Sequence, residues 1–149
     1  YKAFPRFRKR DTNLNIAISD RNEVKPLYIM TIPSLNTLSL KEAERNAKLY
    51  NIKIERTEEK QCYSVEYVLG QHHKGEMPDL LTMDVEGFEL EIFRSFDLST
   101  LRPKVICVEA YDILEDKKVI RKDLVGHLTD QGYSIYADTG LNVILTKEI

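Results

Sequence analysis

The stretch at residues 79–93, DLLTMDVEGFELEIF, joins an apolar run to a helix-like run through two acidic residues and a glycine. The run at 79–83 is apolar almost throughout, which is typical of a strand in a parallel sheet that is covered on both faces. After Gly87, apolar residues recur with the period of an amphipathic helix. This stretch therefore predicts a buried strand that passes directly into a helix, with Asp84 and Glu86 in the turn between them.

Strand and helix patterns alternate along the rest of the chain. The expected strands lie at 16–19, 52–56, 79–83, 104–108, 134–137 and 142–146, and residues 27–30 are expected to form a further short strand or hairpin arm. The expected helices lie at 40–50, 65–72, 87–96 and 117–131. Ser39 and Glu42 form a capping box at the start of the first of these helices. The order predicts an α/β fold with a mostly parallel sheet that includes 16–19, 79–83 and 104–108, closed by two strands antiparallel to each other.

Composition bounds the class of protein. The 149 residues are expected to form a single domain, 1–149, and 42% hydrophobic with 31% charged residues is a globular composition, not a disordered one. A net charge of −2 gives no reason to expect a nucleic-acid partner, and the basic run at 6–10, RFRKR, is more often a solvated helix face than a phosphate site.

No apolar run reaches the ~20 residues of a membrane span. Cys62 and Cys107 lack the spacing of a disulfide or zinc framework, so we expect a reducing, cytoplasmic location.

Several short motifs resemble those of one family, the FkbM-type methyltransferases. The segments that carry the resemblance are NIAISD at 15–20, LNTLS at 35–39, DVEGFELE at 84–91, RPKVICVE at 102–109, GY at 132–133 and LNVI at 141–144. The resemblance implies a Rossmann-like class I methyltransferase sheet, mostly parallel with an antiparallel C-terminal strand. It further implies S-adenosylmethionine as the cofactor and methyl transfer to a hydroxyl oxygen of a small-molecule or glycan acceptor.

The chain also departs from that family pattern. The family binds its cofactor with a glycine-rich loop after its first strand, and none of the six glycines here forms such a loop after an apolar strand. By this resemblance the chain corresponds to the C-terminal two-thirds of a methyltransferase domain, without the N-terminal cofactor-binding strands. The alternative is a truncated or degenerate domain without activity, which acts as an interaction or structural module and dimerises through an exposed sheet edge.

Acidic residues that follow strands are the candidate site. Ligands of open α/β sheets bind beyond the carboxyl ends of the strands, and Asp84 and Glu109 close two strands that should be neighbours. We expect Asp84 to be the catalytic base, with Glu86 and Glu109 as the next candidates, and Asp84 and Asp20 to contact the cofactor. The resemblance places Asp20 near the adenine. We expect Asp20, Asp84 and Glu109 to gather at one edge of the sheet.

Each of these residues also has a structural interpretation. Asp84 can cap the following helix, Glu86 can stabilise its dipole, and Asp20 suits a turn. His72 and His73 lack the i, i+4 spacing of a zinc helix and are expected to lie at a helix end on the surface, and His127 is expected to be structural. We therefore expect no metal site from the sequence.

Overall fold

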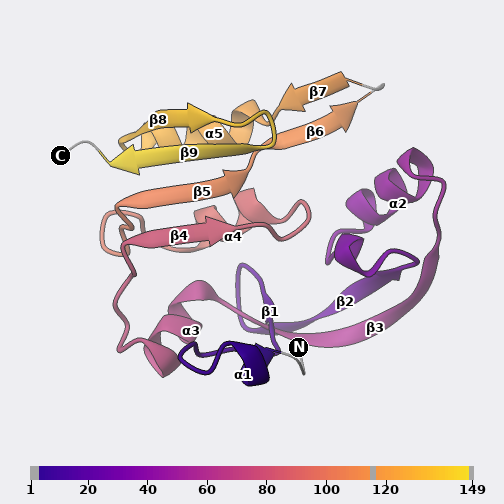
Figure 1. Cartoon of the computed structure of the whole chain (residues 1–149), viewed down its shortest axis with the longest axis horizontal. Coiled ribbons are helices and arrows are strands. Elements are labelled where there is room, and N and C mark those ends of the chain that lie inside the picture. Colours follow the sequence, from indigo (N-terminus) through magenta and orange to yellow (C-terminus); the bar gives the residue numbers. More distant parts are fainter. Residues whose placement is uncertain (1–3, 115–116, 148–149) are drawn as a thin grey trace.

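Two sheets and a separate hairpin organise the chain in the computed structural model, which describes residues 4–114 and 117–147 (Figure 1). The strands are β1 (Ala17–Ile18), β2 (Glu23–Met30), β3 (Ile54–Tyr63), β4 (Leu80–Met83), β5 (Val105–Glu109), β6 (Tyr111–Leu114), β7 (Lys117–Ile120), β8 (Tyr133–Asp138) and β9 (Asn142–Lys147). The helices are α1 (Phe4–Phe7), η1 (Pro33–Leu35), α2 (Leu40–Leu49), α3 (Val65–His72), α4 (Glu89–Ser95) and α5 (Lys122–Asp130). None of the helices described is both long enough and apolar enough to cross a membrane.

The four-stranded sheet has the order β4-β5-β9-β8. β4 and β5 pair in parallel, whereas β9 is antiparallel to both of its neighbours. Three strands therefore run in one direction and the C-terminal strand runs against them. This confirms the expected parallel pairing of 79–83 with 104–108 and the antiparallel closing strands.

The placement of residues 16–19 in that same sheet is wrong. β1 pairs in parallel with β3, and the two belong to a second sheet of order β1-β3-β2. β3 extends well beyond the predicted 52–56, because it pairs antiparallel with the whole of β2 and offers its other edge to Ala17 and Ile18. The sequence correctly indicates that residues 16–19 contain a strand, but the long β2–β3 ribbon determines which sheet it joins.

The predicted helix at 117–131 is also partly wrong. Its first residues form β7, which pairs antiparallel with β6, and α5 begins only after Arg121. Backbone hydrogen bonds to β6 outweigh the helical spacing of Ile120 with the residues that follow it. Leu124 and Leu128 keep the predicted stripe and are fully buried.

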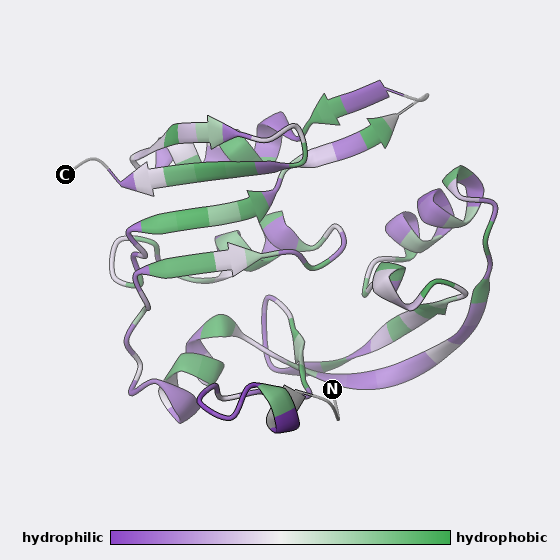
Figure 2. Ribbon diagram, viewed as in Figure 1, coloured by the Kyte–Doolittle hydropathy of each residue, from purple (hydrophilic) through white to green (hydrophobic). Residues whose placement is uncertain are grey.

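The core lies on one face of the four-stranded sheet, where α4 and α5 pack (Figures 1 and 2). Its fully buried side chains include Ile92, Phe93, Ile106, Val108, Leu124, Leu128, Val143 and Leu145. The opposite face carries Cys107 beside Ile144, and both are only half-buried by the described residues. The expectation of cover on both faces is therefore not met within the described chain.

Helix α2 is held against the turn that follows β4. The helix begins as predicted, with the Ser39 hydroxyl accepting a hydrogen bond from the backbone N–H of Glu42. Just before the helix, the Thr37 hydroxyl donates to the carbonyl oxygen of Glu86 at 2.8 Å. This contact ties the β2–β3 ribbon and its helix to the strand end where the candidate site residues lie.

Candidate active site

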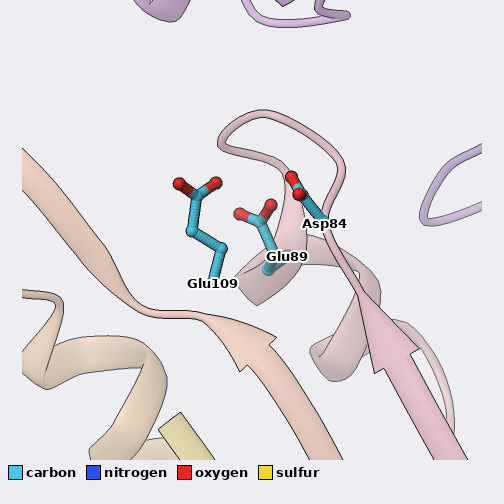
Figure 3. A group of neighbouring side chains, drawn as sticks. All are labelled: Asp84, Glu89 and Glu109. Carbon is cyan, nitrogen blue, oxygen red and sulfur yellow. The ribbon is translucent and has the colours of Figure 1, made fainter. Parts of the chain in front are cut away.

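Three carboxylates converge where β4 and β5 end (Figure 3). Asp84 follows β4, Glu109 is the last residue of β5, and Glu89 opens α4. Each offers an oxygen within 4.8 Å of the other two. Because β4 and β5 are parallel neighbours, their carboxyl ends meet at one sheet edge, and the predicted pairing of Asp84 with Glu109 is confirmed.

Glu89 is the member that the sequence interpretation missed. Its side chain is fully buried and accepts hydrogen bonds from the backbone N–H groups of Val85 (2.9 Å) and Gly87 (3.3 Å). Its other oxygen pairs with the guanidinium of Arg121. A signal was available, because Glu89 precedes Phe93 by four residues and so lies on the apolar stripe of the helix, where an unpaired charge is costly.

The turn between β4 and α4 has an unusual backbone. Glu86 has a φ of 55° and Gly87 a φ of 93°. Residues other than glycine rarely adopt this left-handed region, because their Cβ atom clashes with the backbone. A Cβ atom at Gly87 would lie 2.3 Å from Cγ of Glu42 on α2. Gly87 is therefore required both for its conformation and for the close approach of a helix side chain.

The surroundings of Glu109 raise the pKa of its carboxyl group towards neutrality. Burial, and then the charges of Asp84, Glu86 and Glu89, raise its pKa to about 7, against a weaker opposing effect of Arg121. Its side chain has no hydrogen-bond partner among the described residues. A carboxylate with a pKa near neutrality is well matched to taking a proton from a substrate.

Glu86 has a similar electrostatic environment. Burial, followed by repulsion from Asp84, Glu89 and Glu42, raises its pKa to about 7, while Arg45 opposes the shift. Its position in the left-handed turn sends its backbone carbonyl to Thr37 and its side chain towards the neighbouring cavities. Glu86 therefore belongs to the same acidic region as Asp84 and Glu109.

Asp20 does not join this group. It follows β1 in the other sheet, and its carboxylate accepts hydrogen bonds from Ser19 (2.8 Å), Lys25 (2.9 Å) and Arg21 (2.9 Å). Burial alone would raise its pKa, but these hydrogen bonds outweigh burial and hold the pKa well below its usual range. The expected gathering of Asp20 with Asp84 and Glu109 at one edge of one sheet is wrong, and its contact with a cofactor stays a prediction.

Three hollows border the acidic group, and one of them, between β1, α3 and β4, is lined mainly by apolar side chains. A hollow of about 360 Å³ lies between β1 and the turn after β4, with Ile18, Val85 and Asp84 among its walls. Its walls are partly apolar and partly polar. A second, smaller cavity of about 120 Å³ lies between α2 and the β6–β7 hairpin, with Glu86 and Glu109 in its walls. Asp84 thus borders the larger hollow, Glu109 borders the smaller cavity, and Glu86 borders both.

The three carboxylates are close enough to share a divalent cation, which favours oxygen ligands. Glu89, however, already uses both oxygens, one for the two backbone N–H groups and one for Arg121. Only Asp84 and Glu109 retain unpaired carboxylates within this trio among the described residues.

None of the three histidines belongs to the carboxylate group. His72 and His73 are exposed at the end of α3, and Nδ1 of His73 lies 2.8 Å from the carbonyl oxygen of Glu76. Their predicted place at a helix end on the surface is confirmed. Nε2 of His127 on α5 is buried and has no hydrogen-bond partner among the described residues.

Comparison with known families gives one finding. The family model described as the methyltransferase FkbM domain matches residues 2–135, which is most of the chain. No match was found among the curated proteins or among the solved structures.

Proposed function

This chain belongs to the FkbM methyltransferase family, and on that premise we propose that it transfers a methyl group from S-adenosylmethionine to a hydroxyl oxygen of a small-molecule or glycan acceptor. The observation that carries the proposal is the position of two carboxylates, Asp84 and Glu109, at the shared end of two parallel strands. Neither has a hydrogen-bond partner among the described residues. Hydroxyl groups lose their proton when their oxygen is alkylated, and a carboxylate at this position supplies the acceptor for that proton.

Each acidic residue has a separate role in this proposal, which follows from its surroundings. S-adenosylmethionine, when bound, supplies an electrophilic methyl carbon on a sulfonium sulfur. Asp84 lies in the wall of the larger hollow, within 4.8 Å of a carboxylate oxygen of Glu109 in the wall of the smaller cavity, and accepts the proton that the acceptor hydroxyl loses. Glu109 and Glu86 hold the acceptor by hydrogen bonds and take over the proton. Glu89 fixes the turn that carries Asp84 and Glu86, so it positions these groups without touching the reactants.

The cofactor side of the proposal uses the larger hollow, between β1 and the turn after β4. Its apolar walls suit the adenine, and Asp84 faces the more polar part of the molecule. Asp20 lies at the end of β1, and its carboxylate is held by cations and a hydroxyl of this chain, so it orders this strand end.

The proposal is tested by transfer of a tritiated methyl group from millimolar S-adenosylmethionine to a panel of neutral hydroxyl acceptors. Asp84→Asn should lower the rate by about 100-fold or more, because general-base catalysis typically contributes that much. Asp79→Asn is the matched control, since Asp79 is 78% exposed in its side chain and pairs only with Lys104 on the surface. Equal rates for the two variants, or no transfer to any acceptor, would contradict the proposal.

The alternative of an interaction module is favoured by one observation, the outer edge of β4. β4 ends the four-stranded sheet, and Leu80 on it is 57% exposed. Such an edge is a template for pairing with a second copy of the chain. Sedimentation at increasing concentration tests this: Leu80→Lys should abolish dimerisation, whereas Val24→Lys in the other sheet should leave it unchanged. A monomer at all concentrations would end this alternative.

A further inference from the structure

The smaller cavity has walls from four separate parts of the chain. Helix α2 forms one side, the turn after β4 and the end of β5 form the floor, and the β6–β7 hairpin closes the other side. Arg45 on α2 bonds to Asp112 on β6 at 2.6 Å, so the two sides are fixed relative to each other. The cavity is therefore a built feature of the fold.

Asn46 on α2 is a polar side chain in the wall of this cavity. It is only 3% exposed and lines this cavity. Its carboxamide has no hydrogen-bond partner among the described residues, although its backbone carbonyl accepts the usual helical bond from Tyr50. Asn46 is not among the residues whose side-chain polar atoms are completely enclosed without a partner, so its amide reaches the cavity, where a ligand can satisfy it. A carboxamide both donates and accepts, as a hydroxyl group also does.

The two arginines in the cavity wall each form ion pairs with carboxylates of this chain. Arg45 bonds to Glu42 and Asp112, and Arg121 bonds to the buried Glu89. Nε of Arg45 is buried without a hydrogen-bond partner, but a phosphate or carboxylate ligand would also face the unpaired carboxylates of Glu86 and Glu109. The charges of the site thus disfavour anions and favour a neutral ligand.

The size of the cavity limits how much of a ligand can enter. Its volume of about 120 Å³ corresponds to about four water molecules at ~30 Å³ each. Lys118, at the rim, donates to the carbonyl oxygen of Gly140 and is exposed. The space therefore fits one end of a molecule that carries two or three hydroxyl groups, while the remainder extends past the hairpin into solvent.

We propose that this cavity is the acceptor subsite, and that it binds the neutral, polyhydroxylated end of the acceptor, with Asn46 hydrogen-bonded to one hydroxyl and Glu109 to the hydroxyl beside it. The assignment rests on the proposed function and adds a substrate class to it. Asn46 is then a specificity-determining residue. It selects acceptors with a second hydroxyl next to the one that is methylated, because only these satisfy the buried amide.

Binding without cofactor tests this inference separately from catalysis. Methyl pyranosides are titrated into the whole chain, and the Asn46 side-chain N–H resonances are followed by NMR, with glucuronate as the anionic counterpart. We expect the pyranosides to shift these resonances and glucuronate to bind at least 10-fold more weakly. Asn46→Leu should lower pyranoside affinity at least 10-fold while leaving the melting temperature unchanged or higher, because it removes an unpaired buried amide.

Glu44→Leu is the control on the exposed face of α2 and should bind as the wild type does. Unchanged affinity in Asn46→Leu, shifts confined to other residues, or equal binding of glucuronate would each overturn the inference. The two proposals fail differently. Pyranoside binding without methyl transfer to any acceptor would support the subsite and contradict the proposed function. Methyl transfer with unaltered kinetics in Asn46→Leu would support the function and contradict the subsite.

Discussion

Glu89 and Arg121 form a buried ion pair that joins the first turn of α4 to the N-cap of α5, 32 residues later in the chain. Their side chains are 0% and 13% exposed. Glu89→Ala leaves Arg121 buried without its partner and frees the turn at Val85 and Gly87, so we expect the free energy of unfolding to fall by about 3–5 kcal/mol. Urea denaturation measures the loss.

Glu91→Ala is the control for this variant, since Glu91 lies in the same helix and is exposed. It should change stability by no more than about 0.5 kcal/mol. If both variants lose the same amount, the ion pair contributes nothing beyond helix propensity. The doubly apolar variant Glu89→Leu with Arg121→Met should recover most of the loss, because the penalty comes from the orphaned charge.

A second prediction concerns the turn at Gly87. An alanine there adopts a left-handed φ, which costs about 1–2 kcal/mol, and its Cβ collides with Glu42, which adds about 1–3 kcal/mol. Gly75→Ala is the matched control, because Gly75 also has a positive φ but open space around its Cα. Chemical denaturation should show the larger loss for Gly87→Ala. In a Glu42→Ala background the difference between the two variants should shrink, and an unchanged difference would contradict the assigned clash.

A third prediction follows from the pKa of Glu109, which is raised from 4.5 to about 7. The folded protein holds this proton more tightly than the unfolded chain. Its stabilising contribution is therefore complete below about pH 4.5 and is lost as the pH rises through 7. Glu109→Gln cannot ionise, so it should raise the melting temperature by about 3 °C or more at pH 8.5 and leave it nearly unchanged at pH 5. A pH-independent effect would show that Glu109 ionises freely in the folded state.

Some of this site could be predicted from the sequence, and the reason is local. Asp84 and Glu109 each end an apolar run, and neighbouring parallel strands bring such ends together, so two short patterns were sufficient to place the pair. The unusual backbone of the turn could also be predicted, because a glycine between a strand and a helix indicates such a conformation.

The rest depends on contacts between distant segments. β1 joins the second sheet because β3 offers it an edge, and nothing within residues 16–19 encodes that choice. The pairing of Glu89 with Arg121 links two helix starts, one of which the sequence placed inside a helix. Asn46 is one polar residue among many on α2, and only the packing of that helix against the turn makes it buried.

A final prediction concerns the cofactor. We expect titration calorimetry of this chain with S-adenosylhomocysteine to show no binding in the micromolar range. Micromolar affinity requires about 8 kcal/mol, whereas one charge-assisted hydrogen bond to a carboxylate contributes about 1.5–3 kcal/mol. Both oxygens of the Asp20 carboxylate already accept bonds from this chain, and none of the six glycines forms a glycine-rich loop after a strand within the described residues.

Asp84 shares the wall of the larger hollow with Ser34, Asn36, Thr37 and Glu86, none of which is a cation, and the apolar part of the wall adds only a shallow surface. If weak binding is detected, Asp84→Asn and Asp20→Asn show which of the two residues contacts the cofactor. Only the substitution of the contacting residue should weaken the binding further. Asp20→Asn should also lower stability by about 1–3 kcal/mol through the loss of its bonds to Lys25 and Arg21, which is measured without cofactor. Micromolar binding that survives both substitutions would show that other residues of the chain form the cofactor site.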